Sequence, residues 1–273
     1  MNIAADDDPR RSFADWLITA ENPSFKRNIA NRVWSWLMGR GIIHEPDDIR
    51  PDNPPSNPAL LACLETELVN AKWDLRQLYR LILNSRAYQQ SSIPRSDSPE
   101  AEALFASYLV RPLEAEVLLD ALCGIGGRGE GYTSLIPEPF TFIPENQRAI
   151  TLADGSITSP FLEMFGRPAR DTGLESERNR QPTDAQRIHM LNSSSILQDI
   201  RGSERLRRLI GGAKGDRRAT VHAIYMNILS RHPSPAEVDA AIEYAQSSGL
   251  PPRQDAEDLV WALLNSKEFL YRH

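Results

Sequence analysis

Apolar residues recur at helical spacing along much of the chain. The first clear stripe, which would face the core from one side of a helix, consists of Phe25, Ile29, Val33, Trp36 and Leu37. Gly39 and Gly41 follow this stripe, and we expect them to end the helix because glycine readily adopts the left-handed conformation at a helix C-terminus.

Capping residues mark further helix starts in the first half. Asn57 precedes Pro58, a cap followed by proline at the first helical position, and Asp74 is expected to cap the next helix. Ser98 followed by Pro99 is expected to start another. Between residues 45 and 58 five prolines forbid regular structure, so this stretch is predicted to be a loop.

The last third again has helical periodicity. Thr183 with Gln186 and Ser234 with Glu237 have the spacing of capping boxes. This third also contains three predicted buried stripes: Val221, Ile224, Tyr225 and Ile228; Val238, Ala241, Ile242 and Ala245; and Leu259, Val260, Leu263 and Leu264. The segment 211–218 is glycine-rich and charged, and we expect a mobile loop there.

Residues 124–183 differ from both flanks, because glycine and proline are frequent and helical periodicity is weak. Residues 147–152 and Ile157, separated by a turn-forming Ala-Asp-Gly-Ser, predict a small β-hairpin. Gly124 to Gly129 matches G-x-G-x-x-G, but a helix precedes it where a dinucleotide site needs a strand. It is interpreted as a helix C-cap that leads into a loop.

These patterns predict a mainly α protein, an irregular multi-helix bundle with a loop-rich insert and one small β-hairpin. Residues 1–10 are polar and expected to be a disordered leader. Residues 11–273 are expected to form a single helical domain, with N-terminal helices in 11–123, the irregular insert in 124–183 and C-terminal helices in 184–273.

Composition narrows the function classes. The net charge of −6 argues against general nucleic-acid binding, which needs a basic face. No apolar run approaches the roughly 20 residues that span a bilayer, and no signal peptide is visible. The two cysteines, Cys63 and Cys123, do not make a disulfide framework or a metal-ligand spacing.

Charged residues cluster near one predicted helix and in the insert. The set predicted to form a ligand-binding or structural polar network is Arg32, Arg111, Glu114, Glu116, Asp120, Arg167, Arg170, Glu177 and Arg178. Glu116 and Asp120 are four residues apart on one helix face, so their like charges need cationic partners. One interpretation is a set of salt bridges that pins the insert to the helices, and the alternative is an anion-binding or acid–base pocket.

Other chemistry has weaker support. His44, Glu45, Asp47 and Asp48 bring potential cation ligands together, but they match no cation-binding motif, and adjacent acids usually cap turns. No metal site and no cofactor are therefore predicted.

Several motifs together resemble one known family. They are the stretches 11–17 (RSFADWL), 21–23 (ENP), 31–34 (NRVW), 39–41 (GRG), 53–58 (NPPSNP), 73–75 (WDL), 85–89 (SRAYQ), 111–116 (RPLEAE), 165–168 (FGRP) and 263–269 (LLNSKEF). From residue 11 onward the chain resembles domain of unknown function 1553, found near the C-terminus of large planctomycete-type proteins.

The resemblance implies partners rather than a reaction. Such domains usually follow a companion domain, often with a c-type cytochrome module, in proteins that look exported, which implies a periplasmic or cell-surface location. The chain has no C-x-x-C-H haem motif, so it is expected to be a fragment or a stand-alone copy. Family members often carry a cysteine near the position of Leu174, and the leucine here argues against a thiol role. The family supplies no catalytic residues.

The sequence and the family resemblance leave three functions open. The first is an accessory module that binds a partner domain or a ligand such as polysaccharide. The second is an enzyme that acts on carbohydrate through an arginine- and glutamate-lined pocket. The third, which rests on the family resemblance alone, is a component of a cytochrome-linked electron-transfer system.

Overall fold

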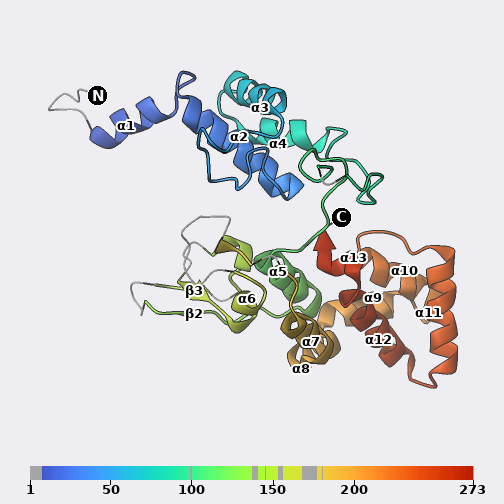
Figure 1. Ribbon diagram of the computed structural model, residues 1–273. Coiled ribbons are helices and arrows are strands. Elements are labelled where there is room, and N and C mark those ends of the chain that lie inside the picture. The colour runs from blue at the N-terminus through green and yellow to red at the C-terminus, as the bar shows by residue number, and fades with distance from the viewer. Residues whose placement is uncertain are drawn as a thin grey trace. The chain divides into compact units, whose positions relative to one another are not determined.

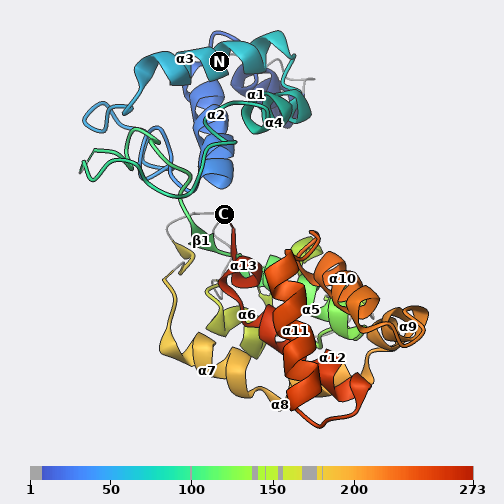
Figure 2. The same cartoon turned by 90° about the vertical axis from the view of Figure 1, so that its right-hand side faces the viewer.

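A computed structural model describes residues 8–98, 100–136, 141–144, 146–152, 156–167, 177–179 and 181–272. The fold is mainly helical, as predicted, and the chain divides into two compact units (Figures 1 and 2). Unit 1 ends at Val110, and unit 2 comprises Arg111–Arg272. The single domain predicted over residues 11–273 stays a prediction.

Unit 1 contains helices α1 (Pro9–Leu17), α2 (Pro23–Met38), α3 (Pro58–Asn70) and α4 (Leu75–Leu83). Asn57 and Asp74 cap α3 and α4, as predicted, because their side-chain oxygens accept hydrogen bonds from backbone N–H groups of the first turn. Gly39 ends α2 at φ 84°, the left-handed cap that was expected. Ser98 does not start a helix, because residues 100–105 form only turns.

The core of unit 1 lies between α2, α3 and α4. Its most deeply buried side chains include Val33, Trp34, Met38, Leu68, Leu78 and Ile82. Of the stripe predicted on α2, Val33 and Leu37 are buried, Phe25 and Ile29 are partly buried, and Trp36 is exposed. Trp34, which was not part of the predicted stripe, is buried. The buried face of α2 is therefore rotated toward Trp34 relative to the predicted stripe, because packing against α3 and α4 decides which side of the helix is covered.

Unit 2 begins with β1 (Arg111–Pro112) and α5 (Ala115–Gly126), and its irregular portion contains β2 (Thr133–Ser134), the short 3-10 helix η1 (Ala149–Thr151), β3 (Ile157–Thr158) and α6 (Pro160–Met164). The remaining elements are α7 (Asp184–Asn192), α8 (Ser194–Gly202), α9 (Glu204–Gly212), α10 (Arg217–Ile228), α11 (Pro235–Ser247), α12 (Pro252–Leu264), α13 (Lys267–Leu270) and β4 (Tyr271–Arg272). Both predicted capping boxes are present.

The two strand pairs of unit 2 are short and antiparallel. β1 pairs with β4, and β2 pairs with β3 with Thr133 opposite Thr158. The predicted hairpin was therefore wrong in its first strand: Ile157 lies in a strand, but residues 149–151 form η1 and the partner strand is 133–134. The expected turn residues 153–155 lie outside the described residues.

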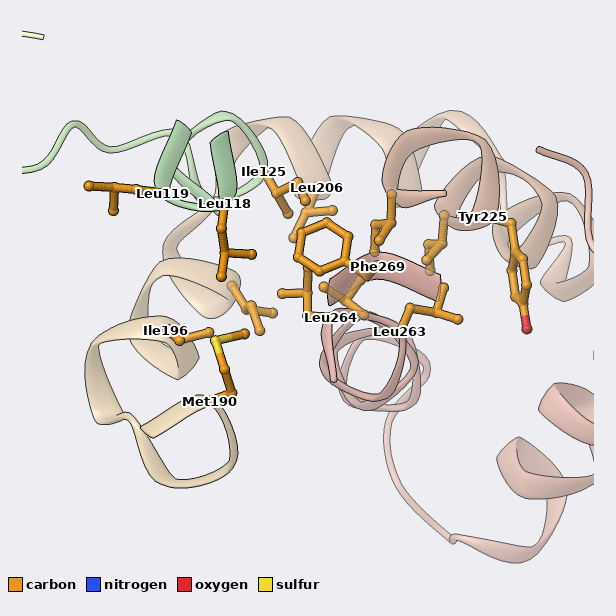
Figure 3. Close-up of a cluster of buried hydrophobic side chains, with 14 of the residues drawn as sticks. Leu118, Leu119, Ile125, Met190, Ile196, Leu206, Tyr225, Leu263, Leu264 and Phe269 are labelled. Carbon is orange, nitrogen blue, oxygen red and sulfur yellow. The ribbon is translucent and has the colours of Figure 1, made fainter. Parts of the chain in front are cut away.

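The core of unit 2 brings together helices from both ends of the unit (Figure 3). Leu118 and Leu119 of α5 belong to the same buried cluster as Leu263 and Leu264 of α12.

Helix α5 ends at Gly126 with Gly127 at φ 79°, so the glycine-rich motif is a helix C-cap, as interpreted. The loop predicted over 211–218 is shorter in the structure, because α9 continues to Gly212 and α10 begins at Arg217.

None of the helices in the described part of the chain combines the length and the apolar character that a bilayer crossing requires.

Candidate functional site

Glu116 is the centre of the polar network in unit 2. It lies in the first turn of α5, where the helix dipole favours a negative charge, and its side chain is only 7% exposed. Burial of a carboxylate is costly unless it is paired and hydrogen-bonded, so the partners of Glu116 decide what this residue does.

Two arginines from the irregular portion bind Glu116. Arg178 donates from Nη1 to Oε2 and from Nη2 to Oε1, both at 2.9 Å, in a bidentate pair. The Nε of Arg167 lies 3.2 Å from Oε1, and the side chain of Arg167 is as buried as that of Glu116. Arg167 also donates to the carbonyl of Ile157 in β3. We call Glu116, Arg167 and Arg178 the Glu116 clamp.

Gly166 explains how Arg167 and Arg178, which are not neighbours in the sequence, reach the same carboxylate. Its φ of 95° favours glycine, and a Cβ at this position would lie 2.0 Å from the carbonyl oxygen of Asn179. The amide of Asn179 donates to the carbonyl of Gly166 at 3.1 Å, which holds the segment 177–179 next to Arg167. The glycine of the Phe-Gly-Arg-Pro motif thus permits a close backbone approach on which the clamp depends.

The clamp keeps Glu116 ionised. Burial acts to raise the pKa of Glu116, but the hydrogen bonds and charge of Arg178, with the charge of Arg167, outweigh it and hold the pKa below the usual 4.5. At neutral pH the carboxylate therefore accepts hydrogen bonds and is not a proton donor.

Asp120, one turn further along α5, holds the backbone of η1. Its carboxylate accepts hydrogen bonds from the amides of Ala149 at 2.7 Å and Ile150 at 3.3 Å, and from Arg148 Nε at 3.3 Å. These are the bonds of a helix N-cap, supplied here by a side chain distant in sequence. The pair of acids at i and i+4 thus has cationic or N–H partners, as their shared helix face requires.

The other predicted residues have different surroundings. Arg111 is buried in β1, opposite Arg272 of β4, and Glu114 immediately precedes α5. Glu177 is exposed. Arg32 belongs to unit 1, where it pairs with Asp47. Arg170 lies outside the described residues.

Two small cavities border the clamp. One, of about 130 Å³, is lined by Glu114, Glu116, Arg167 and Arg178 together with residues of the η1 segment. The other, of about 70 Å³, lies against α7 and is mostly apolar. Arg178 and Glu114 line both cavities. Drug-sized ligands usually occupy pockets of roughly 300–1,000 Å³, so each cavity is small for such a ligand.

A second arginine cluster was not predicted. Arg231 donates to Glu237 at 2.7 and 2.9 Å and to Glu268 at 2.5 and 2.7 Å, which joins the start of α11 to α13. Its hydrogen bonds lower the pKa of Glu237 to about 2. The capping box identified Glu237 in the sequence, but Glu268 lies 37 residues from Arg231, and no local pattern connects them.

The acidic residues around His44 also have protein partners. Arg50 binds Asp48, and His44 Nε2 lies 3.2 Å from Glu45. Within the described ranges, no group of three or more histidine, cysteine or acidic side chains is arranged to hold a metal ion.

Comparison with known proteins yields one match. A family model described as "Protein of unknown function (DUF1553)" matches residues 9–245. No curated protein and no solved structure gives a match.

Proposed function

Because the chain belongs to the DUF1553 family of proteins of unknown function, we propose that it is a non-catalytic accessory module that binds a partner domain or a polysaccharide. The observation that carries this proposal is the bidentate pairing of Glu116 with Arg178. In this function the clamp is structural: it fixes the shape of an irregular segment and so maintains the surface that the segment presents.

The state of Glu116 supports a structural role over catalysis. A general acid needs a pKa raised toward the working pH, and a nucleophile or base needs an oxygen within reach of the substrate. Glu116 has a lowered pKa, and both its oxygens accept hydrogen bonds from Arg178. Its adjoining cavity of about 130 Å³ is small for a substrate.

The partner classes follow from the family resemblance. A companion domain of the same exported system is the first, with a c-type cytochrome as one form of it, and a cell-surface polysaccharide is the second. Loops held rigidly by a scaffold are common binding elements, which agrees with a module whose irregular portion is tied to α5 at Glu116 and Asp120.

A hydrolytic enzyme is the second candidate. The observation in its favour is that two carboxyl groups, those of Glu114 and Glu116, line one polar cavity with Arg167 and Arg178. Paired carboxylates are the catalytic groups of most glycoside hydrolases. This candidate requires Glu116 to leave Arg178 when substrate binds.

One experiment separates the two candidates. The purified chain is incubated with neutral and acidic polysaccharides, and released reducing ends are measured for the wild type, Glu114→Gln and Glu116→Gln. We expect no release above background from any of the three, and retarded migration of the wild type in gels that contain a bound polysaccharide. Turnover by the wild type that disappears in both folded variants would overturn the accessory-module proposal.

A further inference from the structure

A cavity of about 540 Å³ lies among α10, α11 and α12 in unit 2. Its walls are mainly apolar and include Val221, Ile224, Ala241, Ile242, Leu259 and Trp261. Its volume falls in the range of small-molecule sites, and it shares no lining residue with the cavities at the Glu116 clamp.

The side chains of α11 explain why space remains here. The predicted buried stripe on this helix contains Ala241 and Ala245, which line the cavity and are only partly buried. Val238, one turn earlier, is fully packed. Protein interiors are normally close-packed, so small side chains facing two neighbouring helices leave room that a larger group can fill.

Asp255 gives this cavity a specific polar feature. It lies in the first turn of α12 and is 7% exposed. Its Oδ1 accepts a hydrogen bond from Ser248 Oγ at 2.6 Å, whereas its Oδ2 accepts none within the part of the chain that the structure describes. Arg217 Nη2 forms an ion pair with Oδ2 at 3.9 Å, a distance too long for a hydrogen bond.

The other charged residues of the cavity wall are differently engaged. Asp258 Oδ2 accepts a hydrogen bond from Tyr244 Oη at 2.8 Å. With Asp255, Asp258 and Arg217 all on the wall, acids outnumber cations by one. An unsatisfied carboxylate oxygen in this surrounding favours a donor that carries positive charge.

We propose that this cavity binds a small apolar amine, with its ammonium group donating to Asp255 Oδ2 and its apolar body against α10, α11 and Trp261. The site goes beyond the proposed function and does not depend on the Glu116 clamp. A charge-assisted hydrogen bond satisfies Oδ2, and the apolar walls supply the hydrophobic contact area.

The test uses three probes with the same indole body and different head groups: tryptamine, tryptophol and indolepropionate. Their binding to the full chain is measured by titration calorimetry. We expect tryptamine to bind about tenfold more tightly than tryptophol, the gain expected of a charge-assisted hydrogen bond, and indolepropionate to bind most weakly. Equal affinities for the amine and the alcohol, or no binding of tryptamine, would overturn the proposal.

Two matched substitutions locate the ammonium group. Asp255→Asn should weaken tryptamine binding about tenfold and change tryptophol binding little, because the amide keeps the shape but loses the charge. Asp258→Asn, on the same wall, should have a much smaller effect because Tyr244 engages that carboxylate. An equal loss in both variants would assign the preference to the general negative field and contradict the role of Asp255.

A second pair of variants tests the cavity without touching a charge. Ala245→Phe fills the cavity and should abolish binding of tryptamine and tryptophol, whereas Ala240→Phe, at an exposed position of the same helix, should leave binding unchanged. Circular dichroism confirms that each variant is folded. Unchanged binding in folded Ala245→Phe would contradict the site, and the polysaccharide assays would still decide the accessory-module proposal separately.

Discussion

The most deeply buried side chain that holds the irregular segment differs in chemistry between the two units. In unit 1 the side chain of Asn31, which is fully buried, donates to the carbonyls of Ile43 and Pro46 and accepts from the amide of Ile43. In unit 2 the charged side chains of Glu116 and Asp120 bind the irregular portion. In both units, the side chain of a helix residue binds a segment that lacks regular structure.

The difference shows how a neutral side chain and a charged side chain perform the same structural task. A neutral amide can satisfy backbone donors and acceptors together, and its contribution does not change with pH. A carboxylate accepts only, so it suits guanidinium groups and N–H groups, and its contribution depends on protonation. The hydrogen bonds of Asn31 and the Glu116 clamp should therefore respond differently to substitution and to acid.

The largest expected effect is from Glu116→Ala. Removing the carboxylate leaves Arg167 and Arg178 without their shared partner, one of them deeply buried, and should lower the free energy of unfolding by about 3–5 kcal/mol. Chemical denaturation measures the change. Glu177→Gln, at an exposed position beside Arg178, is the control and should cost under about 0.5 kcal/mol. Similar losses in both variants would contradict the clamp.

Asn31→Ala should have the next largest effect, about 3 kcal/mol, because buried backbone groups of Ile43 and Pro46 lose their partners. Asn28→Ala on the same helix is the control, since Asn28 is only partly buried. A loss no larger than that of the control would show that other groups brace this loop.

The same two variants test the predicted single domain. If residues 11–273 unfold as one domain, calorimetry should show one transition that both Asn31→Ala and Glu116→Ala shift to lower temperature. Two transitions, each shifted by only one of the variants, would contradict the prediction.

The cysteines offer one chemical probe in each unit. Cys63 on α3 is exposed, while burial and nearby acids raise the pKa of Cys123 on α5 to about 11. Relative to the usual 9.0, this lowers the thiolate fraction of Cys123 about a hundredfold. Mass spectrometry after brief iodoacetamide treatment should find Cys63 labelled well before Cys123, and the reverse order would contradict the burial of Cys123.

The smallest expected effect on stability is that of acid, which should weaken the Glu116 clamp but not the hydrogen bonds of Asn31. The pKa of Glu116 is lower in the folded protein than its usual 4.5, so its contribution is present above pH 4.5 and is lost as the pH falls toward the folded pKa. The stability difference between the wild type and Glu116→Gln should therefore shrink below pH 4.5. The difference between the wild type and Asn31→Ala should stay constant, because amides do not titrate. Thermal melts from about pH 7 to about pH 3 measure both differences.

Local patterns alone predicted the helical class, the caps at Asn57, Asp74, Thr183 and Ser234, and the glycine that ends α2, because these depend on residues only a few positions apart. They also marked Glu116, Arg167 and Arg178 as polar residues in need of partners. Tertiary structure decided which partners met, since Glu116 and Arg178 are 62 residues apart and meet only through the close approach at Gly166. It also decided that Thr133 pairs with Thr158, that Arg231 binds Glu268, and that the alanines of α11 border a cavity. Such contacts depend on how whole helices pack, which no short sequence window records.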